Sequence, residues 1–417
     1  MKRFQGDEYI HFVRSNWRLL AFGFLMAFSS SFGQTWFIGL FTPNIERAFG
    51  LSHGEWGTIF MVGTLLSAAL LVFSGSLIDR LSLKLYSLLV CGLLAIACVA
   101  FAATPNAWFL LISVFLLRHA GQGLASHTSI TAMVKNFPLH RGKAVAIAAM
   151  GFPAARGVLP VLVIFTILAV GWRETYLICA IIVLMLLAPV TGGLLRSHDQ
   201  KTKNAVSNPK LSLSDQLEHR FSPTLKQVLY KPHIYLIIPG LAAPSFFDTA
   251  LSFHLLPVAE LKSWPANWVT TGYTVYGLAT ITVSMWTGIV VDKYGSKTIF
   301  TYSLIPYVLG ILALAFSNGP IWSWVYLGFF GIGSGVRMTL IPVVLSEFYG
   351  VKHIGAIRSF IATLGVFASA MGPPILGFAL DKKITLPTMA AMAIIYFILA
   401  TGLMMYANYR SRKTLRN

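Results

Sequence analysis

The sequence predicts an all-α polytopic membrane protein with twelve transmembrane helices in two pseudo-symmetric bundles of six. Long apolar runs, a scarcity of charge and a pattern repeated between the two halves predict this class. Of 417 residues, 56% are hydrophobic and 11% are charged, whereas soluble domains carry about 25% charged residues. A soluble protein of this composition would lack polar surface. The composition therefore excludes a soluble enzyme, a secreted disulfide scaffold and a disordered tail.

A helix needs about 20 apolar residues to cross a bilayer. Six runs without Asp, Glu, Lys or Arg meet this length directly, and two spans carry one inner charge each. Two longer runs are divided at Thr104-Pro105-Asn106 and at Ser317-Asn318-Gly319-Pro320, where turn-forming residues cluster. The expected helices cover residues 18–42, 56–78, 83–103, 107–133, 143–170, 174–195, 232–258, 268–291, 297–316, 321–345, 355–380 and 387–408.

The spans define three parts of the chain. We expect a six-helix bundle at 1–195, a polar cytoplasmic loop at 196–231 with an amphipathic helix in "LSLSDQLEHRF", and a second bundle at 232–417. Lys and Arg gather in the loops on the side of both termini, which predicts cytoplasmic ends. The net charge of +18 is therefore mainly a topology signal facing anionic lipid, and no nucleic-acid partner is expected.

Two stretches of the chain repeat each other. "GSLIDRLSLK" begins at Gly75 and includes Asp79 and Arg80, while "GIVVDKYGSK" contains the equivalent residues Gly288, Asp292 and Lys293. "RHAGQG" in the first half likewise corresponds to "GIGSGV" in the second. Several pairs at nearly one offset predict two related halves, which is one known plan of transporters.

With these motifs the sequence resembles the major facilitator superfamily. The Gly-x-x-x-Asp-Arg/Lys pattern after the second and eighth helices is the loop motif of that family, and "LLRHAGQG" is similar to its helix-4 motif, with Arg118 in the arginine position. The resemblance implies a transporter rather than an enzyme, in which the loop-motif residues act as conformational latches. Glu347, which ends the tenth expected helix, is expected to join this cytoplasmic network.

Two further stretches resemble the monocarboxylate and oxalate–formate branch of the family. They are Gly39–Gly57 and Asn136–Gly151, the second of which contains matching residues Phe137, Arg141, Ala144, Ala148 and Gly151. That branch tends to carry an acid in helix 1 and a base in helix 8. This chain has Phe32-Gly33-Gln34 in helix 1 and no charge in helix 8, so its proton site is sought elsewhere.

Four ionised side chains interrupt the expected spans: Arg118, Arg156, Asp248 and Arg337. A charge at the bilayer centre costs from about 2.5 to more than 10 kcal/mol, so such residues line wet cavities or pair with one another. Three bases against one acid predict a positively biased aqueous pocket between the halves. Since Arg matches carboxylate geometry, we expect the three arginines to bind an anion. Two amides, Gln34 and Gln122, would add neutral hydrogen bonds.

Each arginine also has a structural interpretation. Arg118 could fasten its helix to neighbouring carbonyl groups. Arg156 lies between Pro153 and Pro160, where prolines loosen the backbone. Arg337 could neutralise Asp248 instead of binding a substrate.

Asp248 is the best candidate for a proton carrier, because a buried carboxyl group can titrate near working pH. The alternative is a permanent ion pair with Arg337, which would not cycle. His119 and His254 could also titrate near neutrality, although polar packing is the favoured interpretation of each.

The sequence therefore predicts proton-coupled symport of a small organic anion of monocarboxylate type. The alternative is a proton-antiporting exporter of a larger amphipathic or anionic compound, such as a siderophore or drug. A sensor without flux is a third class, which the short termini disfavour. We expect no cofactor besides protons, no metal, lipid and a small anionic solute as partners, a monomer, and a bacterial inner (plasma) membrane location.

Overall fold

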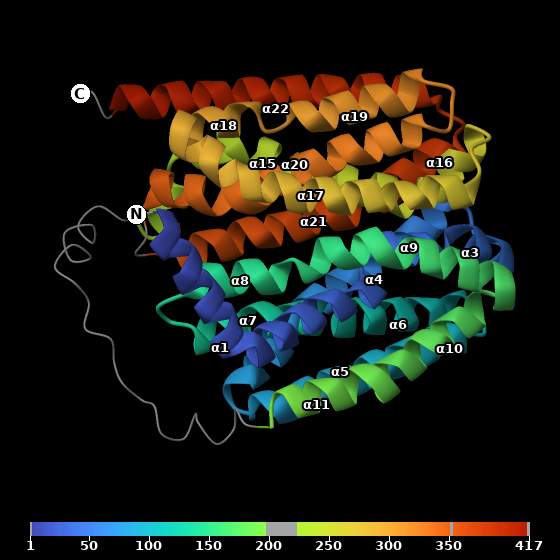
Figure 1. Ribbon diagram of the computed structural model, residues 1–417. Helices are drawn as coiled ribbons and strands as arrows, with labels where there is room; N and C mark the ends of the chain where they lie inside the picture. The colour runs from blue at the N-terminus through green and yellow to red at the C-terminus, as the bar shows by residue number, and fades with distance from the viewer. Residues whose placement is uncertain (1, 197–222, 351–352, 415–417) are drawn as a thin grey trace. The chain divides into compact units, whose positions relative to one another are not determined.

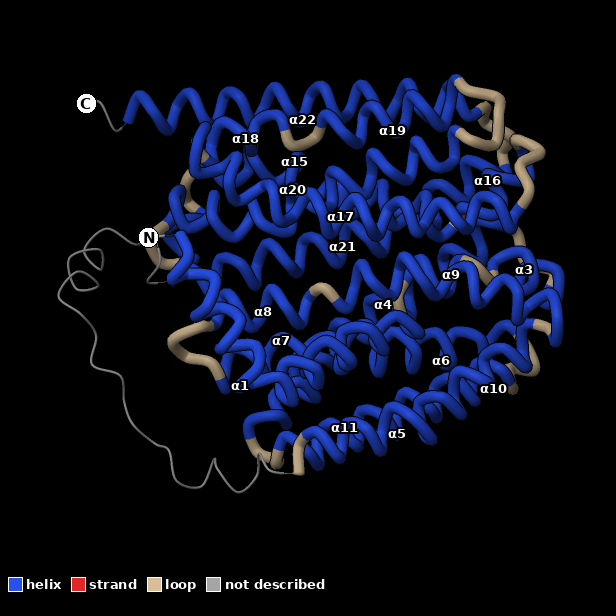
Figure 2. Tube along the Cα trace, in the orientation of Figure 1, coloured by secondary structure: helices blue, strands red, loops and turns tan. Residues whose placement is uncertain are grey.

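The computed structural model describes residues 2–196, 223–350 and 353–414. The amphipathic helix expected at residues 211–221 lies outside these ranges. Within them the chain forms helices joined by short turns, and no strand occurs there (Figure 2). The expected all-helical architecture is therefore confirmed.

Eleven helices in the described ranges are long and apolar enough to cross a membrane. They match the second to twelfth expected spans and cover His53–Asp79, Leu83–Ala102, Ala107–Asn136, Arg141–Val170, Trp172–Leu194, Pro232–Phe253, Ala266–Tyr294, Ser296–Phe316, Trp322–Tyr349, Ile354–Asp381 and Leu386–Arg410. The side chain of Asn106 accepts a hydrogen bond from the Phe109 amide at 3.1 Å, so the expected division near Pro105 coincides with a capped helix start.

The first expected span, 18–42, is broken in the structure. It is divided among α1 (Lys2–Ser29), the 3₁₀ turn η1 (Ser30–Gly33) and α2 (Thr35–Gly39), and α3 (Thr42–Phe49) follows. The hydroxyl groups of Ser29 and Ser30 donate to main-chain oxygens three residues earlier, at 3.2 and 2.7 Å, and such bonds compete with regular helix. The apolar part of α1 thus ends at Ser29, which leaves eleven uninterrupted spans in the described ranges where the sequence predicted twelve.

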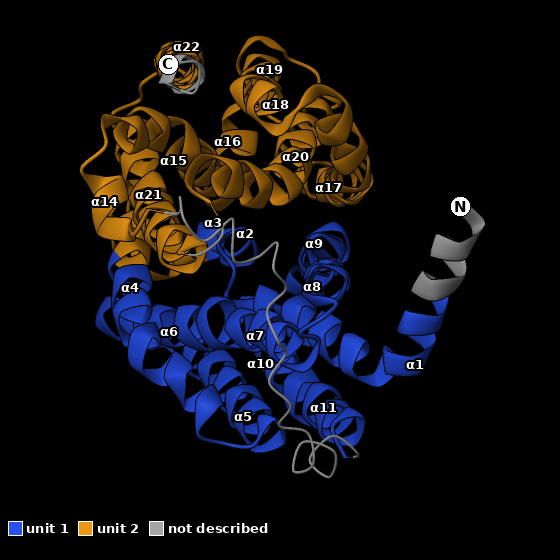
Figure 3. Ribbon diagram, turned by 90° about the vertical axis from the view of Figure 1, so that its left-hand side faces the viewer, with its two compact units in different colours: residues 1–44, 62–207 blue, residues 45–61, 208–417 orange. Residues whose placement is uncertain are grey.

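The chain forms two compact units, Met1–Asn44 with Val62–Ser207 and Ile45–Met61 with Asn208–Asn417 (Figure 3). Figure 1 follows the helices in chain order. Those after α3 and before the central loop are α4 (His53–Ser74), η2 (Gly75–Asp79), α5 (Leu83–Ala102), α6 (Ala107–Leu117), η3 (Arg118–Ala125), α7 (Ser126–Asn136), α8 (Arg141–Ala149), α9 (Gly151–Val170), α10 (Trp172–Ile182), η4 (Val183–Leu187) and α11 (Ala188–Leu194).

After the central loop the helices are α14 (Leu225–Leu229), α15 (Pro232–Phe253), α16 (Leu255–Leu261), α17 (Ala266–Tyr294), α18 (Ser296–Tyr302), α19 (Ile305–Phe316), α20 (Trp322–Tyr349), α21 (Ile354–Asp381) and α22 (Leu386–Thr414). In this second unit α17 packs along α20, and α15 packs on α21. In the first unit α5 packs along α10, and η1 packs on η3. The η1–η3 contact positions the site described next.

Candidate functional site

Arg118 lies at the start of η3, a π-helical segment within the fourth expected helix. π-helical segments are rare and often mark functional sites. The Arg118 side chain is 2% exposed. Its Nη1 donates to the main-chain oxygen of Gly33 at 2.9 Å, and its Nε donates to Thr64 Oγ1 at 3.0 Å. A second bond from Nη1 reaches Thr35 Oγ1 at 3.3 Å. The guanidinium group thus binds the carbonyl left at the break in the first helix.

The break in the first helix and the π-helical segment approach each other backbone to backbone. A Cβ built on Gly121 would lie 2.7 Å from the Cα of Gly33, and one on Gly33 would lie 2.0 Å from the main-chain oxygen of Leu117. Real Cβ atoms essentially never come this close. Glycine is therefore required at both positions, and this contact brings Arg118 within reach of the break.

Arg337 has the same relationship to a loosened helix in the second unit. Its Nη2 donates to the main-chain oxygen of Leu241 at 2.8 Å, and its Nη1 donates to that of Gly240 at 3.4 Å. Pro244 lies inside α15 and has no N–H for the carbonyl four residues earlier, which is Gly240. Arg337 therefore supplies the donor that the helix itself lacks.

Arg156 is 8% exposed and lies in α9. Pro160 is in the same helix and provides no N–H for the main-chain oxygen of Arg156. All three intramembrane arginines thus accompany a proline or a break that frees a carbonyl group. Discontinuous helices of this kind are typical of transporter binding sites.

Gln34 and Gln122 both lie at the η1–η3 junction. Gln34 is the extended residue between η1 and α2, and Gln122 belongs to η3. Both are partly exposed. The packing of η1 on η3 therefore brings two of the expected substrate-binding amides onto adjoining segments, together with Arg118.

Asp248 lies in the last third of α15, and its side chain is partly exposed. Its two carboxyl oxygens lie 3.4 Å from Ser252 Oγ and 3.4 Å from the hydroxyl group of Tyr276. Both neighbours are neutral hydroxyl groups that can donate to the carboxylate.

The two candidate histidines lie in different units. His119 in η3 has its Nε2 3.1 Å from Ser74 Oγ and its Nδ1 3.4 Å from the main-chain oxygen of Ser67. His254 caps the end of α15, is 0% exposed, and places its Nε2 2.8 Å from the main-chain oxygen of Pro373.

The loop-motif residues lie at helix ends. Asp79 forms an ion pair with Lys135 at the end of α7, and the Lys135 amine also donates to the main-chain oxygen of Ile78 at 3.3 Å. Arg80, Asp292, Lys293 and Glu347 are exposed. Gly75 is buried at the start of η2, and Gly288 is partly buried, with no described heavy atom within 4 Å of a built Cβ.

Sequence reasoning missed three features of these sites. Lys135 was not recognised as the partner of Asp79, although its place at the end of a helix was a usable signal. The π-helical geometry of η3 had only the small residues of "HAGQG" to indicate it. Asp381 caps α4 by accepting bonds from the amides of His53 at 3.0 Å and Gly54 at 2.8 Å, and no local pattern links positions so far apart in sequence.

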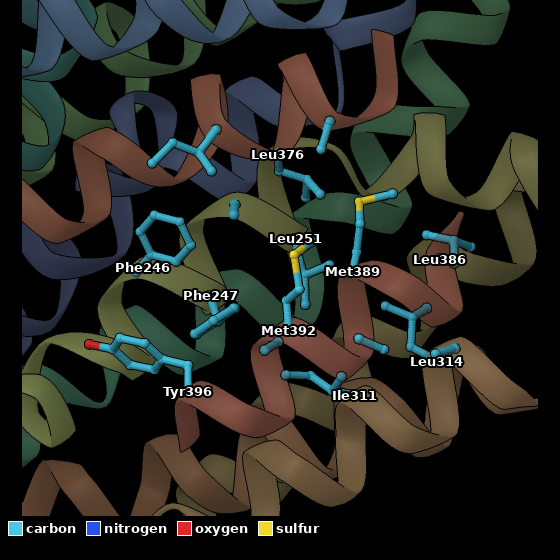
Figure 4. Close-up of a pocket in the computed structure, with 16 residues that line it drawn as sticks. Phe246, Phe247, Leu251, Ile311, Leu314, Leu376, Leu386, Met389, Met392 and Tyr396 are labelled. Carbon is cyan, nitrogen blue, oxygen red and sulfur yellow. The ribbon is translucent and has the colours of Figure 1, made fainter. Parts of the chain in front are cut away.

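A separate cavity of about 300 Å³ lies among α15, α19, α21 and α22 (Figure 4). Its lining is apolar apart from the Tyr396 hydroxyl group, and includes Phe246, Phe247, Met389 and Met392. Such a cavity suits an apolar group and offers no cation for an anion among the residues that line it.

Comparisons with known proteins agree with this architecture. The family described as the Major Facilitator Superfamily matches residues 23–373. A solved structure, titled as a bacterial homolog to the human lysosomal transporter Spinster in an inward-facing and unoccupied conformation, is similar with a TM-score of 0.70 and 13% identity, over 95% of this chain and 97% of that one. Among curated proteins, none matches the sequence.

Proposed function

The chain belongs to the major facilitator superfamily, and from that premise we propose that it is a proton-coupled symporter of a small organic anion of monocarboxylate type. The family and the fold make it a secondary transporter that works by alternating access, rather than an enzyme. The solute class and the coupling ion are the proposal.

The observation that carries the proposal is the charge inside the spans. Away from the ends of the described spans, the guanidinium groups of Arg118, Arg156 and Arg337 stand against the single carboxylate of Asp248. The acceptors of Arg118 and Arg337 include main-chain carbonyl and threonine hydroxyl oxygens, which are neutral groups. An anionic solute would compensate the excess of positive charge, since net charge within a bilayer is costly.

Within the first unit, the junction of η1 and η3 supports a place for the solute. Gln34 and Gln122 can donate from their amides, and Arg118 supplies positive charge beside them. Arg156 offers a further planar fork for a carboxylate. We assign two roles to Arg118 and Arg337. They donate hydrogen bonds to the interrupted first helix of each half, and their positive charge attracts the anionic solute.

Asp248 is assigned to proton coupling. When it is protonated, one positive charge more remains for the solute, so proton and anion would bind cooperatively. His119 and His254 are second candidates for the proton carrier. Each already has a ring nitrogen within hydrogen-bond distance of a neutral oxygen.

The test is uptake of a panel of labelled monocarboxylates into liposomes that contain the purified protein. We expect accumulation that rises when the outside is made acidic, and that loses this pH-gradient response in Asp248→Asn but not in Glu174→Gln, an exposed control. Uptake that ignores the gradient in the wild type would refute the coupling, and full gradient-driven uptake in Asp248→Asn would refute the residue assignment.

The apolar cavity of Figure 4 favours a second candidate function, the export of a larger amphipathic compound. Aromatic and methionine side chains suit such cargo. This candidate predicts that cells expressing the protein resist amphipathic compounds and that Ala393→Trp, at the cavity wall, abolishes the resistance.

A further inference from the structure

The segment Ile45–Met61 comes from the first half of the sequence but packs within the second unit; we name it the linking segment. The rings of Trp56 and Phe60 pack against that of Phe253 in tilted contacts, with centroids 5.3 and 4.6 Å apart. Gly57 approaches α21 so closely that a Cβ there would lie 2.7 Å from the main chain of Pro373. The linking segment is thus fitted tightly to α15 and α21.

Three side chains with metal-binding atoms meet where the linking segment touches the end of α15. They are Glu46 of α3, His53 at the start of α4, and His254, and one ligand atom from each lies within 4.8 Å of the others. His53 Nδ1 lies 2.7 Å from Glu46 Oε1. The rings of His53 and His254 meet edge to face at 5.9 Å.

His254 supplies the decisive observation. Its Nε2 lies 2.8 Å from the main-chain oxygen of Pro373, and a carbonyl oxygen can only accept, so Nε2 carries the hydrogen. In the neutral ring, Nδ1 then holds a bare lone pair. This atom is buried and has no hydrogen-bond partner among the described residues. Histidines that bind metals commonly donate one ring N–H to a main-chain carbonyl and bind the ion with the other nitrogen.

We propose that Glu46, His53 and His254 form a binding site for a divalent transition metal of the zinc class. Two imidazoles and one carboxylate suit Zn²⁺, Co²⁺ or Ni²⁺, whereas Ca²⁺ and Mg²⁺ prefer oxygen ligands alone. Zinc bonds of about 2.0–2.2 Å would bring the ligand atoms to about 3.4 Å from one another. Small side-chain adjustments achieve this, and water completes a tetrahedron.

No pattern in the sequence indicated this site, and the expectation was that no metal binds. Glu46 and His53 are seven residues apart, outside the short spacings that metal motifs use, and His254 belongs to the other half of the chain. Only the packing of the linking segment brings the ligands together.

A metal bound here would fasten the linking segment to the end of α15. α4 begins in the linking segment and continues at Val62 into the first unit. Alternating access requires the two halves to move against each other, so the fastened state would be slow to cycle. We therefore expect the bound metal to inhibit transport. This expectation rests on the proposed function, whereas the binding itself does not.

Calorimetric titration of the full chain with Zn²⁺ in detergent tests the binding, with the protein purified through a tag that contains no histidine. We expect one equivalent to bind the wild type, and dissociation constants raised by about tenfold or more in Glu46→Gln and His254→Gln. His140→Gln, which changes an exposed histidine outside the cluster, serves as the matched control and is expected to bind as the wild type does.

The proposal is overturned if the wild type takes up no Zn²⁺, or if the two ligand variants bind it unchanged. Equal loss in His140→Gln would also overturn it, because binding would then be non-specific. Each variant is checked for monodisperse elution. Should His254→Gln fail to fold, His53→Gln takes its place in the same titration.

The inhibition is measured separately, as proteoliposome uptake with and without Zn²⁺. We expect Zn²⁺ to cause a loss of uptake in the wild type and none in Glu46→Gln. Unchanged uptake in the Zn²⁺-loaded wild type would refute the inhibition. If no transported anion is found, the proposed function fails, while the calorimetric result still decides the metal site.

Discussion

The guanidinium group of Arg118 binds the main-chain oxygen of Gly33 at 2.9 Å, at the point where the first helix breaks. Arg337 has the equivalent relationship to Gly240 in the second unit, at 3.4 Å. Each half of the chain therefore has an arginine in its fourth helix that donates to a main-chain oxygen of its first helix. This bond replaces the N–H donor that the first helix lacks at that point. The two arrangements are alike in kind but not in register, because Arg337 follows Arg118 by 219 residues whereas the repeated glycine and aspartate pairs lie 212 or 213 residues apart. The break also arises from serine and glycine in one half and from proline in the other.

Replacing Arg118 leaves the Gly33 oxygen and the Thr64 hydroxyl group without their donor in a buried place. We expect Arg118→Gln to lower stability by about 2–3 kcal/mol, and Arg118→Lys to recover only part of it, because an ammonium group lacks the planar fork. Thermal unfolding in detergent measures the effect, with the exposed Arg141→Gln as control. Equal melting temperatures for Arg118→Gln and the control would contradict the role.

The approach of Gly121 to Gly33 makes a single methyl group costly. Gly121→Ala is expected to destabilise the protein by about 1–3 kcal/mol, because the nearest atoms are rigid backbone. Gly142 in α8 has no described heavy atom within 4 Å of a built Cβ, so Gly142→Ala should be neutral or gain up to about 1 kcal/mol. Unfolding of the two variants under identical conditions distinguishes a crowded glycine from an open one, and the reverse order would be inconsistent with the close contact.

A double-mutant cycle tests whether Arg337 compensates for Pro244. Pro244→Ala restores an N–H that can donate to the Gly240 oxygen within α15. Arg337→Gln should therefore cost about 1 kcal/mol less in the Pro244→Ala variant than in the wild type. Free energies of unfolding for the four proteins give the coupling, and strictly additive costs would show that the two residues act independently.

Asp381 holds the first turn of α4 through its two carboxylate oxygens. An amide has only one oxygen to accept with, and it lacks the negative charge that favours a helix N-terminus. Asp381→Asn is therefore expected to speed hydrogen exchange at the amides of His53 and Gly54 by about tenfold, while Glu174→Gln leaves them unchanged. Unaltered exchange in Asp381→Asn would mean that the first turn needs no external cap.

Much of the fold could be predicted from the sequence because transmembrane helices are determined by local composition. A run of about 20 apolar residues must become a helix in a bilayer, and eleven spans lie where such runs predicted them. The break at Ser30–Gly33 could not be predicted from hydropathy, since serine and glycine are tolerated in membrane helices. The packing of η3 against the break is a tertiary contact, which local composition does not show.

The candidate site was predictable in its residue types but not in its contacts. A charge within an apolar run is visible in the sequence, so Arg118, Arg156, Asp248 and Arg337 could all be identified. Their partners could not, because main-chain oxygens carry no sequence signature. The freed carbonyl of Gly240 is an exception: Pro244 follows it by four residues, and the rule that proline frees such a carbonyl would have indicated a partner for Arg337.

Selectivity between a carboxylate and its uncharged amide analogue tests the central claim most directly. We measure initial uptake of both compounds into proteoliposomes for the wild type, Arg156→Gln and Arg14→Gln, a control at an exposed arginine outside the motifs. We predict that the wild type and the control favour the carboxylate by about tenfold or more, a difference of about 1.4 kcal/mol, and that Arg156→Gln loses most of this preference. Equal uptake of amide and carboxylate by the wild type would contradict an anion-selective site.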